Sequence, residues 1–466
     1  MAYKILNAIF PLISATYLAR VLLPEGVGKV SAAQNIVAYF TTVAALGIPT
    51  YGVREIAKHR NDQNKTNRTF SELFLINFVC TAACAIVYYI MIGRLYNNEL
   101  SLYAVCGSLI LFNFINIDWL YQGEEEYVYI AVRSTIIKAV SIVMLFIFVK
   151  DTQDYIIYAL INCLATGGNY VFNIIHAKKY VKFVTHGLQF KKHMKPVFIL
   201  AVCLIASQLY SMVDITMLSN SCEEQVVGYY NNAHKMVILV FTLTTAISAI
   251  FLPRISYYFE TDRTQYNKFV SIGLKLAFFF SLPCCIGLIL VAEDLTPVMF
   301  GDAFIPATTV VKILSLLVFI KSIGDILCYQ VMISSGNEKY LFLTYSAAAI
   351  VNIILNSILI PRFAQNGAAI ASVISELIVN IPLLPYVLKL VKLDVSKRFM
   401  VSLSISSISM TVIVWITSQI FDNHFLSLFV SVLAGVVTYL GINILLKNEI
   451  VIVVTDGIKK KLKGSN

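Results

Sequence analysis

The stretch "ATYLARVLLPEGVG" (15–28) decides the fold class, because it shows how this chain ends its first long apolar run. The run begins within a few residues of Met1 and contains one charge, Arg20, before the turn Pro24–Gly26. A bilayer core about 30 Å thick needs about 20 helical residues, which is the length available here. No small-residue cleavage site follows, so we expect a retained first membrane span.

The composition extends this expectation to the whole chain. Of 466 residues, 58% are hydrophobic and 13% are charged; the charged share is about half that of a soluble domain. Such a chain has too few polar residues to cover a water-soluble core. In lipid every backbone polar group must bond within its own segment, so we predict an all-α polytopic membrane protein.

Reading the chain in lengths of about 20 residues gives about 14 transmembrane helices. They are predicted at 4–23, 30–53, 70–92, 102–121, 128–149, 155–176, 196–218, 227–251, 271–292, 308–334, 340–360, 367–388, 399–420 and 426–446.

The Lys and Arg residues predict the orientation, because cytoplasmic loops carry the excess of positive charge. With the N-terminus inside, the inner loops are 54–69, 122–127, 177–195, 252–270, 335–339, 389–398 and 447–466. Together with Lys4 they hold 25 basic residues, against four in the outer loops. Both termini are therefore predicted to be cytoplasmic. The net charge of +10 then reflects an anionic inner leaflet rather than nucleic acid. One misfit is 122–127, which carries three glutamates yet lies inside.

A weak internal repeat relates 16–54 to 216–254 without a gap. The identical pairs are Thr16/Thr216, Leu18/Leu218, Val27/Val227, Gly28/Gly228, Ala33/Ala233, Val37/Val237, Thr42/Thr242 and Arg54/Arg254. The repeat aligns spans 1–2 with spans 7–8, so the two units would run parallel. We predict an N-lobe (1–195, spans 1–6), a C-lobe (196–392, spans 7–12), and spans 13–14 with a basic cytoplasmic tail (393–466). Two lobes around one cleft are typical of alternating access.

Charged residues inside the predicted spans are the first candidate site residues, because a charge at mid-bilayer costs at least about 3 kcal/mol and needs a partner or water. The candidates for a cationic substrate cavity are Arg20, Lys235, Lys321, Lys138 and Arg54. Asp325, Glu376 and Asp118 are candidates for ion coupling. An ion pair that only holds packing is the alternative for Lys321 and Asp325, which are four residues apart. Snorkelling towards the interface readily explains Asp118 and Arg133, which lie near the inner ends of their spans, and is the preferred interpretation of both.

Amide side chains at helical spacing predict a polar lining for the same cavity. They are Gln34, Asn35, Asn162, Asn169 and Asn173. Hydrogen bonding between helices competes with this interpretation for each residue. The nine cysteines lie mostly in apolar runs and form no C-x-x-C pair, and the six histidines are scattered. We therefore expect no metal site and no cofactor.

Three segments resemble a known family. "YLARVLLPEGVGKVSAAQNIVAYFTTVAALGIPTYGVREIAK" (17–58) resembles the opening of bacterial polysaccharide flippases, which translocate O-antigen and capsular repeat units. "DWLYQGEEEYVYIAVRS" (118–134) is similar to the family's segment between spans 4 and 5. "LIPRFAQNGAAIASVISE" (359–376) is similar to its stretch between spans 11 and 12, which lipid II flippases and multidrug antiporters of the same exporter superfamily share more widely.

The resemblance implies transport of an undecaprenyl-diphosphate-linked oligosaccharide from the inner to the outer leaflet of the bacterial cytoplasmic membrane, for surface polysaccharide biosynthesis. It implies that Arg20 lines the cavity between the lobes, where we predict contact with the diphosphate, since a planar guanidinium suits phosphate oxygens. The alternative is that Arg20 snorkels to the outer headgroups. Arg54 would meet the substrate at an inner gate or serve as a plain positive-inside anchor.

Rival functions make different demands on the sequence. No P-loop motif is present, so an ATP-driven pump is disfavoured. A polysaccharide polymerase or ligase would need a sizeable outer loop with catalytic residues, and the longest, 293–307, contains no His, Arg or Lys. We therefore expect a secondary transporter and no enzyme. A cation-coupled multidrug antiporter is the nearer alternative. Coupling to protons or sodium stays open, as does association with a polymerase or with glycosyltransferases.

Overall fold

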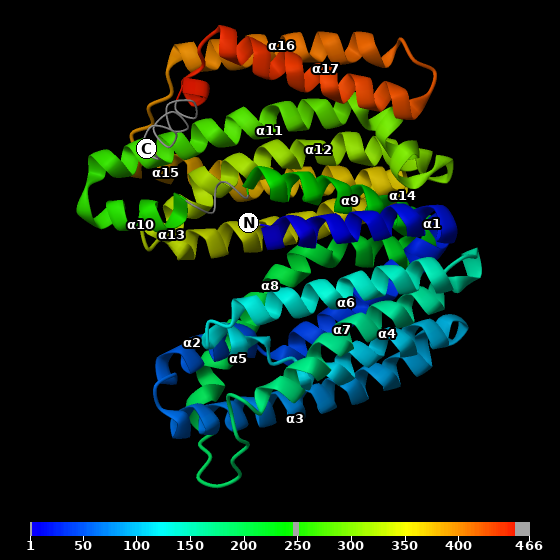
Figure 1. The fold of residues 1–466 in the computed structure, drawn as a ribbon, viewed down its shortest axis with the longest axis vertical. Coiled ribbons are helices and arrows are strands. Elements are labelled where there is room, and N and C mark those ends of the chain that lie inside the picture. The colour runs from blue at the N-terminus through cyan, green and yellow to red at the C-terminus, as the bar shows by residue number, and fades with distance from the viewer. Residues whose placement is uncertain (1, 246–250, 453–466) are drawn as a thin grey trace, which may run out of the picture. The chain divides into compact units, whose positions relative to one another are not determined.

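The computed structural model describes residues 2–245 and 251–452, and across this range the chain is helical and contains no strand. The inner end of the eighth predicted span (246–250) and most of the predicted tail (453–466) lie outside the described residues. The chain divides into two compact halves, 1–228 and 229–466 (Figure 1). The predicted division at 195 and 392 stays a prediction.

The N-terminal half consists of long apolar helices joined by short helical turns. Its helices are α1 (Ala2–Ala45), α2 (Ile48–His59), α3 (Gln63–Leu95), α4 (Leu100–Phe112), α5 (Asp118–Gly123), α6 (Tyr127–Phe148), α7 (Tyr155–Ala177) and α8 (Lys191–Ser221). The first turn of α9 (Glu224–Thr245) also belongs to this half.

The C-terminal half continues α9 and adds eight helices. They are α10 (Phe251–Thr261), α11 (Arg263–Phe300), α12 (Thr308–Gly324), α13 (Val331–Ser334), α14 (Glu338–Asn380), α15 (Leu384–Leu390), α16 (Lys397–Ser418) and α17 (His424–Leu445). A π-helical turn, Asp325–Gln330, connects α12 to α13.

Ten helical stretches within the described residues are long and apolar enough to cross a membrane. Two of them, 10–59 and 338–390, are 50 and 53 residues long. Each contains a non-helical residue, Leu23 (φ 58°) in α1 and Ala364 (φ 45°) in α14. These positions lie at the predicted outer turns, but the predicted loops of six residues are wrong, because helix resumes directly after each break. The count of 14 spans and the cytoplasmic termini stay predictions.

The second predicted span (30–53) is too long. The helix breaks at Leu46 and Gly47, which both have positive φ. Gly47 has φ 85°, and a Cβ at this position would lie 2.7 Å from the side chain of Leu200, so both the backbone angle and the packing favour glycine. After the break α2 forms a separate helix with one buried edge, which includes Ile48 and Ile56.

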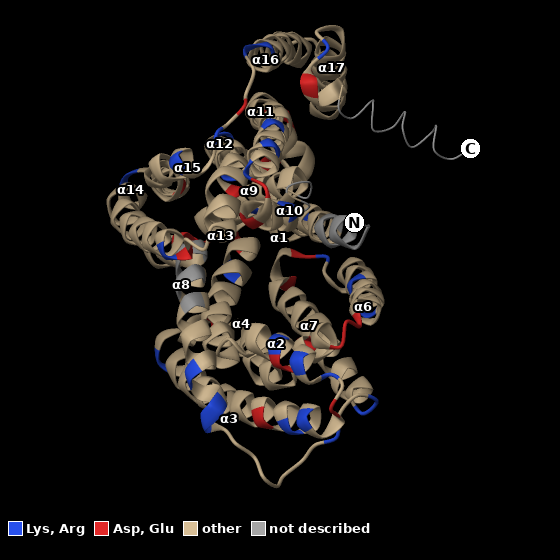
Figure 2. Cartoon of the chain, turned by 90° about the vertical axis from the view of Figure 1, so that its left-hand side faces the viewer, with Lys and Arg blue, Asp and Glu red and all other residues tan. Residues whose placement is uncertain are grey.

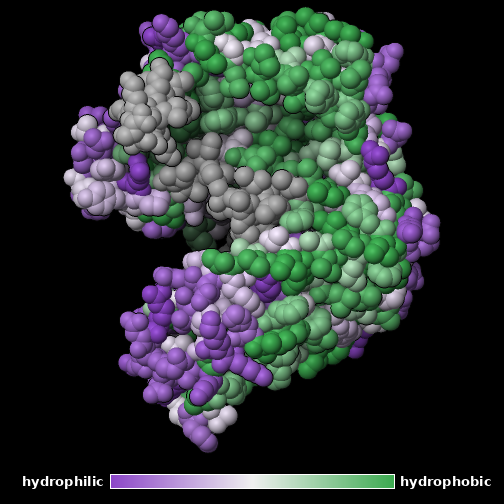
Figure 3. Space-filling model, viewed as in Figure 1, coloured by the Kyte–Doolittle hydropathy of each residue, from purple (hydrophilic) through white to green (hydrophobic). Residues whose placement is uncertain are grey.

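Loops predicted to lie on the inner side contact one another in the N-terminal half. Arg60 pairs with Glu125 at 2.8 Å, and the Tyr180 hydroxyl donates to Glu126 at 2.7 Å. These contacts explain how two of the three glutamates of 122–127 fit beside basic loops. Figure 2 shows Lys and Arg gathered at this end of α2 and α3, and Figure 3 shows the same end as hydrophilic, whereas the flanks of the long helices are apolar.

The predicted outer loops of the N-terminal half also meet. Lys29 pairs with Glu99 at 3.0 Å, and the Tyr155 hydroxyl donates to the same carboxylate at 3.0 Å. The contacts therefore group the loops of this half into the two sets that the charge count predicts. They do not determine which set faces the cytoplasm.

Contacts in the C-terminal half also group its segments into a predicted inner set and a predicted outer set. On the predicted inner side, Lys275 pairs with Glu449 at 2.6 Å. On the predicted outer side, His424 Nδ1 lies 2.6 Å from Asp294 Oδ1. The alternation of predicted spans is therefore consistent with the contacts within each half.

The two halves repeat the same helix start 200 residues apart. Asp62 caps α3 by accepting a hydrogen bond from the Lys65 amide at 3.1 Å. Asp262 caps α11 by accepting one from the Thr264 amide at 2.8 Å. Each cap satisfies a backbone donor that the helix leaves open, which is worth about 1 kcal/mol.

A second pair of side chains extends this structural repeat. Asn67 Oδ1 accepts from the Lys182 amide at 2.8 Å, and Asn267 Oδ1 accepts from the Lys392 amide at 3.0 Å. Two serines one helical turn further on repeat the arrangement, with Ser71 accepting from the Val184 amide and Ser271 from the Asp394 amide. In both halves an extended segment is thereby fastened to the first turns of a long helix.

Glycines at the repeat positions Gly28 and Gly228 allow α1 and the first turn of α9 to cross closely. A Cβ on Gly28 would lie 1.7 Å from the carbonyl oxygen of Glu224, and one on Gly228 would lie 2.1 Å from that of Pro24. No side chain fits at those separations. The crossing is reciprocal, since each glycine meets the residue four positions before its counterpart.

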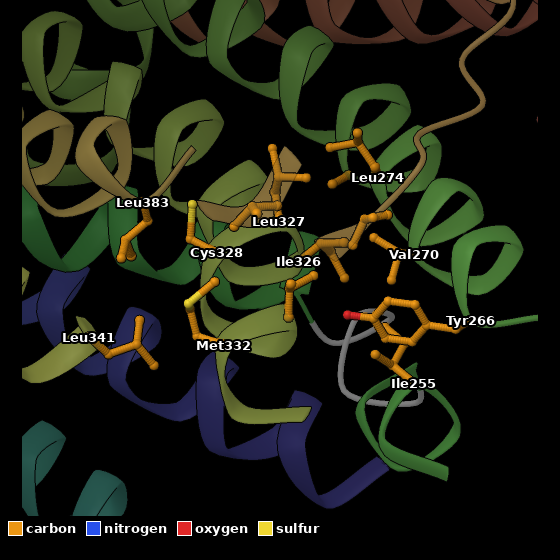
Figure 4. Close-up of a cluster of buried hydrophobic side chains, with 14 residues drawn as sticks. Ile255, Tyr266, Val270, Leu274, Ile326, Leu327, Cys328, Met332, Leu341 and Leu383 are labelled. Atoms are coloured by element: carbon orange, nitrogen blue, oxygen red, sulfur yellow. The ribbon is translucent and has the colours of Figure 1, made fainter. Parts of the chain in front are cut away.

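Apolar clusters hold the C-terminal half together. One cluster joins Ile255 of α10 to Tyr266 and Val270 of α11 and to Ile326 of the π-helical turn (Figure 4). A second packs α16 and α17 against α11. There the Tyr439 hydroxyl donates to the Phe279 carbonyl at 2.7 Å, which satisfies a buried polar group.

Candidate transport site

The C-terminal half contains a pocket of about 250 Å³ between α12, the π-helical turn and α14, lined by both polar and apolar side chains. Lys321 of α12 lies at its wall and pairs with Glu376 of α14, Nζ to Oε2, at 3.2 Å. Asn380 donates to Glu376 Oε1 at 3.3 Å. Glu376 is 5% exposed, so its charge depends on these partners rather than on water.

Asp325 lies in the same pocket, but its hydrogen-bond partner is Gln330 and not Lys321, the ion-pair partner considered from the sequence. Its Oδ2 accepts from Gln330 Nε2 at 3.0 Å, five residues further along the chain. That spacing matches the i to i+5 register of a π-helical turn. Lys321 and Asp325 both line the pocket. The ion pair of Lys321, however, is made with the neighbouring helix and not with the residue four positions on.

The N-terminal half brings the predicted residues Asp118, Asn169 and Asn173 together around Arg133. Arg133 Nη2 lies 3.0 Å from Asp118 Oδ1, and its Nε donates to Asn169 Oδ1 at 3.0 Å. Asn173 donates to the same Asp118 oxygen at 2.7 Å. Arg133 is 7% exposed. The two charges pair with one another while the Asp118 side chain stays 31% exposed, so the snorkelling alternative remains open.

This network has unused hydrogen-bonding capacity. Arg133 Nη1 and Asn173 Oδ1 are both buried without a hydrogen-bond partner among the described residues. One atom donates and the other accepts. Buried polar atoms of this kind are usually satisfied by water or by a ligand.

Of the predicted amides of α1, Asn35 is buried and Gln34 is half-buried, and Asn35 joins two helices. Asn35 donates to Thr216 Oγ1 of α8 at 2.6 Å. Its Oδ1 and the Nε2 of Gln34 are buried without a partner in the described part of the chain. Asn162 lies half-buried on α7. Interhelical bonding therefore accounts for part of Asn35, while a polar lining remains a prediction for these three residues.

The five predicted basic residues are distributed over both halves. Arg20 is exposed on α1, Lys138 is half-buried on α6, and Arg54 is exposed on α2, where it lies over the Tyr51 ring. Lys235 is exposed on α9 in the C-terminal half, which also holds Lys321. Neither half alone brings all five into one site, so the shared cationic cavity stays a prediction.

A buried ionic cluster escaped the sequence analysis. Glu72 of α3 has no exposed surface and accepts from His193 Nε2 of α8 at 2.7 Å. Its carboxylate also pairs with Lys192 at 2.9 Å and Arg68 at 3.2 Å. His193 Nδ1 in turn lies 2.9 Å from the Tyr51 hydroxyl of α2. The available signals were a carboxylate inside an apolar run and Arg68 four residues before it, whereas nothing in the sequence indicated Lys192 or His193 as partners.

Comparisons with known proteins agree with this architecture. The chain is 24% identical over 393 residues to a putative O-antigen transporter of Shigella dysenteriae, covering 83% of this chain and 96% of that protein. A putative O-antigen transporter of Escherichia coli K12 is also 24% identical, over 82% of this chain and 93% of its own.

Solved structures show the same fold. The lipid II flippase MurJ in an inward closed conformation matches with a TM-score of 0.81 at 17% identity, covering 96% of this chain and 99% of that chain. An inward-facing multidrug resistance MATE family transporter of the MOP superfamily matches with a TM-score of 0.66 at 13% identity, covering 82% and 94%. The family model described as polysaccharide biosynthesis protein matches residues 1–259. The chain therefore belongs to the polysaccharide biosynthesis protein family.

Proposed function

We propose that this protein translocates an undecaprenyl-diphosphate-linked oligosaccharide from the inner to the outer leaflet of the bacterial cytoplasmic membrane by alternating access. The observation that carries the proposal is the match to the Shigella putative O-antigen transporter over 96% of that protein's length. A secondary transporter of this kind has no catalytic residues, and its work is to carry a polar headgroup through hydrocarbon.

The polar side chains between the helices of each half are suited to carrying a polar headgroup through the membrane. Sugars and a diphosphate need water or protein partners throughout the crossing, because unsatisfied polar groups are costly in lipid. The pocket around Lys321 and the network around Arg133 supply such partners within the two halves. Arg20 contacts the diphosphate in this proposal, where its fork of donors can bind two oxygens at once.

Asp325 is the preferred coupling residue among the three acidic candidates. Glu376 and Asp118 each form an ion pair with a basic residue at 3.2 Å or less. Asp325 is held by an amide donor from Gln330. A carboxylate without a fixed countercharge can take up a proton or a sodium ion at lower cost than one that must first break a buried pair.

Multidrug export is the second candidate function, because MATE transporters share the fold with a TM-score of 0.66. The two functions differ in their substrate and therefore in what a depleted cell accumulates. A flippase leaves the lipid-linked oligosaccharide on the cytoplasmic side, whereas a drug exporter leaves its leaflet distribution unchanged and raises drug sensitivity.

The test uses cells depleted of this protein that still build the lipid-linked oligosaccharide. A membrane-impermeant sugar-modifying reagent reports which leaflet holds it. Depletion should protect the sugar from the reagent, and wild-type protein should restore exposure. Arg20→Ala should restore much less than wild type, while Arg362→Ala on the predicted outer surface serves as the matched control. If the oligosaccharide is exposed without the protein, the proposed function is wrong.

A further inference from the structure

A second pocket, of about 330 Å³, lies wholly within the N-terminal half, on the predicted outer side. It is formed by α1, by the turn between α3 and α4, and by the chain from the end of α8 into α9. Nothing in the sequence analysis assigns it a role. Its volume is that of a small ligand site.

An ionic and aromatic framework holds one wall. Lys29 Nζ lies 3.0 Å from carboxylate oxygens of both Glu25 and Glu99. The rings of Tyr96 and Tyr103 stack with their centroids 4.2 Å apart. The Tyr103 backbone is itself fixed, because its carbonyl accepts a hydrogen bond from a buried tyrosine of α3 at 2.7 Å.

Three amide side chains at the pocket have hydrogen-bonding capacity to spare. Asn97, Asn98 and Asn220 are exposed and form no side-chain hydrogen bond within the described residues. Each amide presents two donors and an acceptor. Three of them on two separate segments can satisfy a ligand that carries several groups able both to donate and to accept.

The amides, tyrosines and charges that line the pocket indicate which class of ligand it can bind. A sugar ring offers hydroxyl groups to amides and a C–H face to aromatic rings, which bury apolar surface while they keep a polar edge. Lys29 already has two carboxylate partners, and Glu224 adds a further negative charge to the lining. The pocket therefore favours a neutral sugar over an anionic one.

We propose that this pocket binds one neutral sugar residue of the transported oligosaccharide on the outer side of the membrane. The proposal rests on the function proposed above for the identity of the ligand and for the side on which the pocket lies. A weak sugar site there would hold the headgroup after translocation and reduce its return.

The test uses saturation-transfer NMR to measure the transfer of magnetisation from the purified full-length protein in detergent to a bound sugar. The probes are N-acetylglucosamine and the neutral monosaccharides released by acid hydrolysis of the host's surface polysaccharide, with glucuronate as the anionic comparison. At least one neutral sugar should receive saturation from wild type. The Asn98→Ala/Asn220→Ala variant should reduce the signal at least fivefold, while Asn61→Ala/Asn64→Ala, on the predicted inner side, should leave it unchanged.

Size-exclusion elution and helical circular dichroism establish that both double variants are folded. The proposal is overturned if no neutral sugar receives saturation, if the pocket variant binds like wild type, or if glucuronate binds more strongly than every neutral sugar. The leaflet assay separates the two proposals. Sugar binding without translocation would overturn the proposed function and leave a sugar pocket that serves no transported oligosaccharide, whereas translocation without sugar binding would overturn the pocket assignment alone.

Discussion

Glu72 and His193, which are 121 residues apart in the chain, form a fully buried contact of 2.7 Å that joins α3 to α8. Removing the Glu72 charge weakens the hydrogen bond to the buried His193, while Lys192 remains partly exposed to solvent. We expect Glu72→Gln to destabilise the protein by about 1–3 kcal/mol, the range for a buried hydrogen-bonding group that loses its partner. Thermal unfolding in detergent measures this, with the exposed Glu260→Gln as control. Equal melting temperatures for the two variants would contradict the stabilising role.

Asn67 and Asn267 occupy equivalent positions in the two halves, so we expect the same substitution at each to loosen one segment of its own half. Asn67→Ala should release the segment around Lys182, and Asn267→Ala should release that around Lys392, because each segment loses a backbone hydrogen bond. Because Lys182 and Lys392 are exposed and water can replace the lost partner, each change should cost about 0.5–1.5 kcal/mol. Limited trypsin digestion should cut each variant faster at its own segment.

The matched control for this digestion is Asn64→Ala, which alters an exposed asparagine at the start of the same α3. Its cleavage pattern should equal that of wild type. The interpretation would be contradicted if Asn67→Ala did not speed cleavage around Lys182, or if Asn267→Ala did not speed cleavage around Lys392. Either result would mean that the asparagine does not hold the segment of its own half in place.

The Lys321–Glu376 pair separates a packing role from a transport role. Lys321→Ala removes the basic partner of a nearly buried carboxylate, so we expect a loss of about 3 kcal/mol in stability. The exchange Lys321→Glu/Glu376→Lys restores opposite charges and should recover most of that loss. If the cation has to lie on α12 to meet substrate, the exchanged protein should fold but translocate poorly. Full recovery of both properties would assign the pair to packing alone.

Glu449 predicts an acid-dependent loss of stability. Lys275 and Ser396 hydrogen-bond its carboxylate and lower its pKa below the ordinary value of 4.5. Because the folded pKa is lower than the unfolded one, the stabilisation is complete above about pH 4.5 and disappears as the pH falls through the folded pKa. Glu449→Gln should lower the melting temperature at pH 7 and lessen its decline towards pH 3, and an unchanged pH profile would contradict this.

Charge counting predicted which loops lie together better than it predicted helix shape. Arg60 and Glu125, from two predicted inner loops, form an ion pair, while the side of the membrane that these loops face stays a prediction. Helix breaks depend on local backbone angles. Leu23 has a positive φ, which could not be predicted because leucine rarely adopts this conformation. Gly47 also has a positive φ, and as a glycine it could have been used to predict the end of the second span.

The candidate site was predictable in part. Helical spacing grouped Asn169 with Asn173, and both amides lie in the Arg133 network. The partner of Lys321 was not predictable from spacing, because a π-helical turn begins at Asp325 and the ion pair forms across helices instead. Contacts such as Glu72 with His193 depend on tertiary packing over 121 residues, which no periodic pattern encodes.

The central claim is that this chain moves a lipid-linked oligosaccharide across a bilayer. The most direct test reconstitutes the purified protein into vesicles that carry the oligosaccharide lipid in both leaflets, and then adds an impermeant sugar-modifying enzyme outside. Protein-free vesicles should expose only their outer-leaflet fraction. Vesicles with the protein should expose nearly all of the lipid over time, and Arg20→Ala should slow that approach. An accessible fraction equal to that of protein-free vesicles, from folded wild-type protein, would contradict the account.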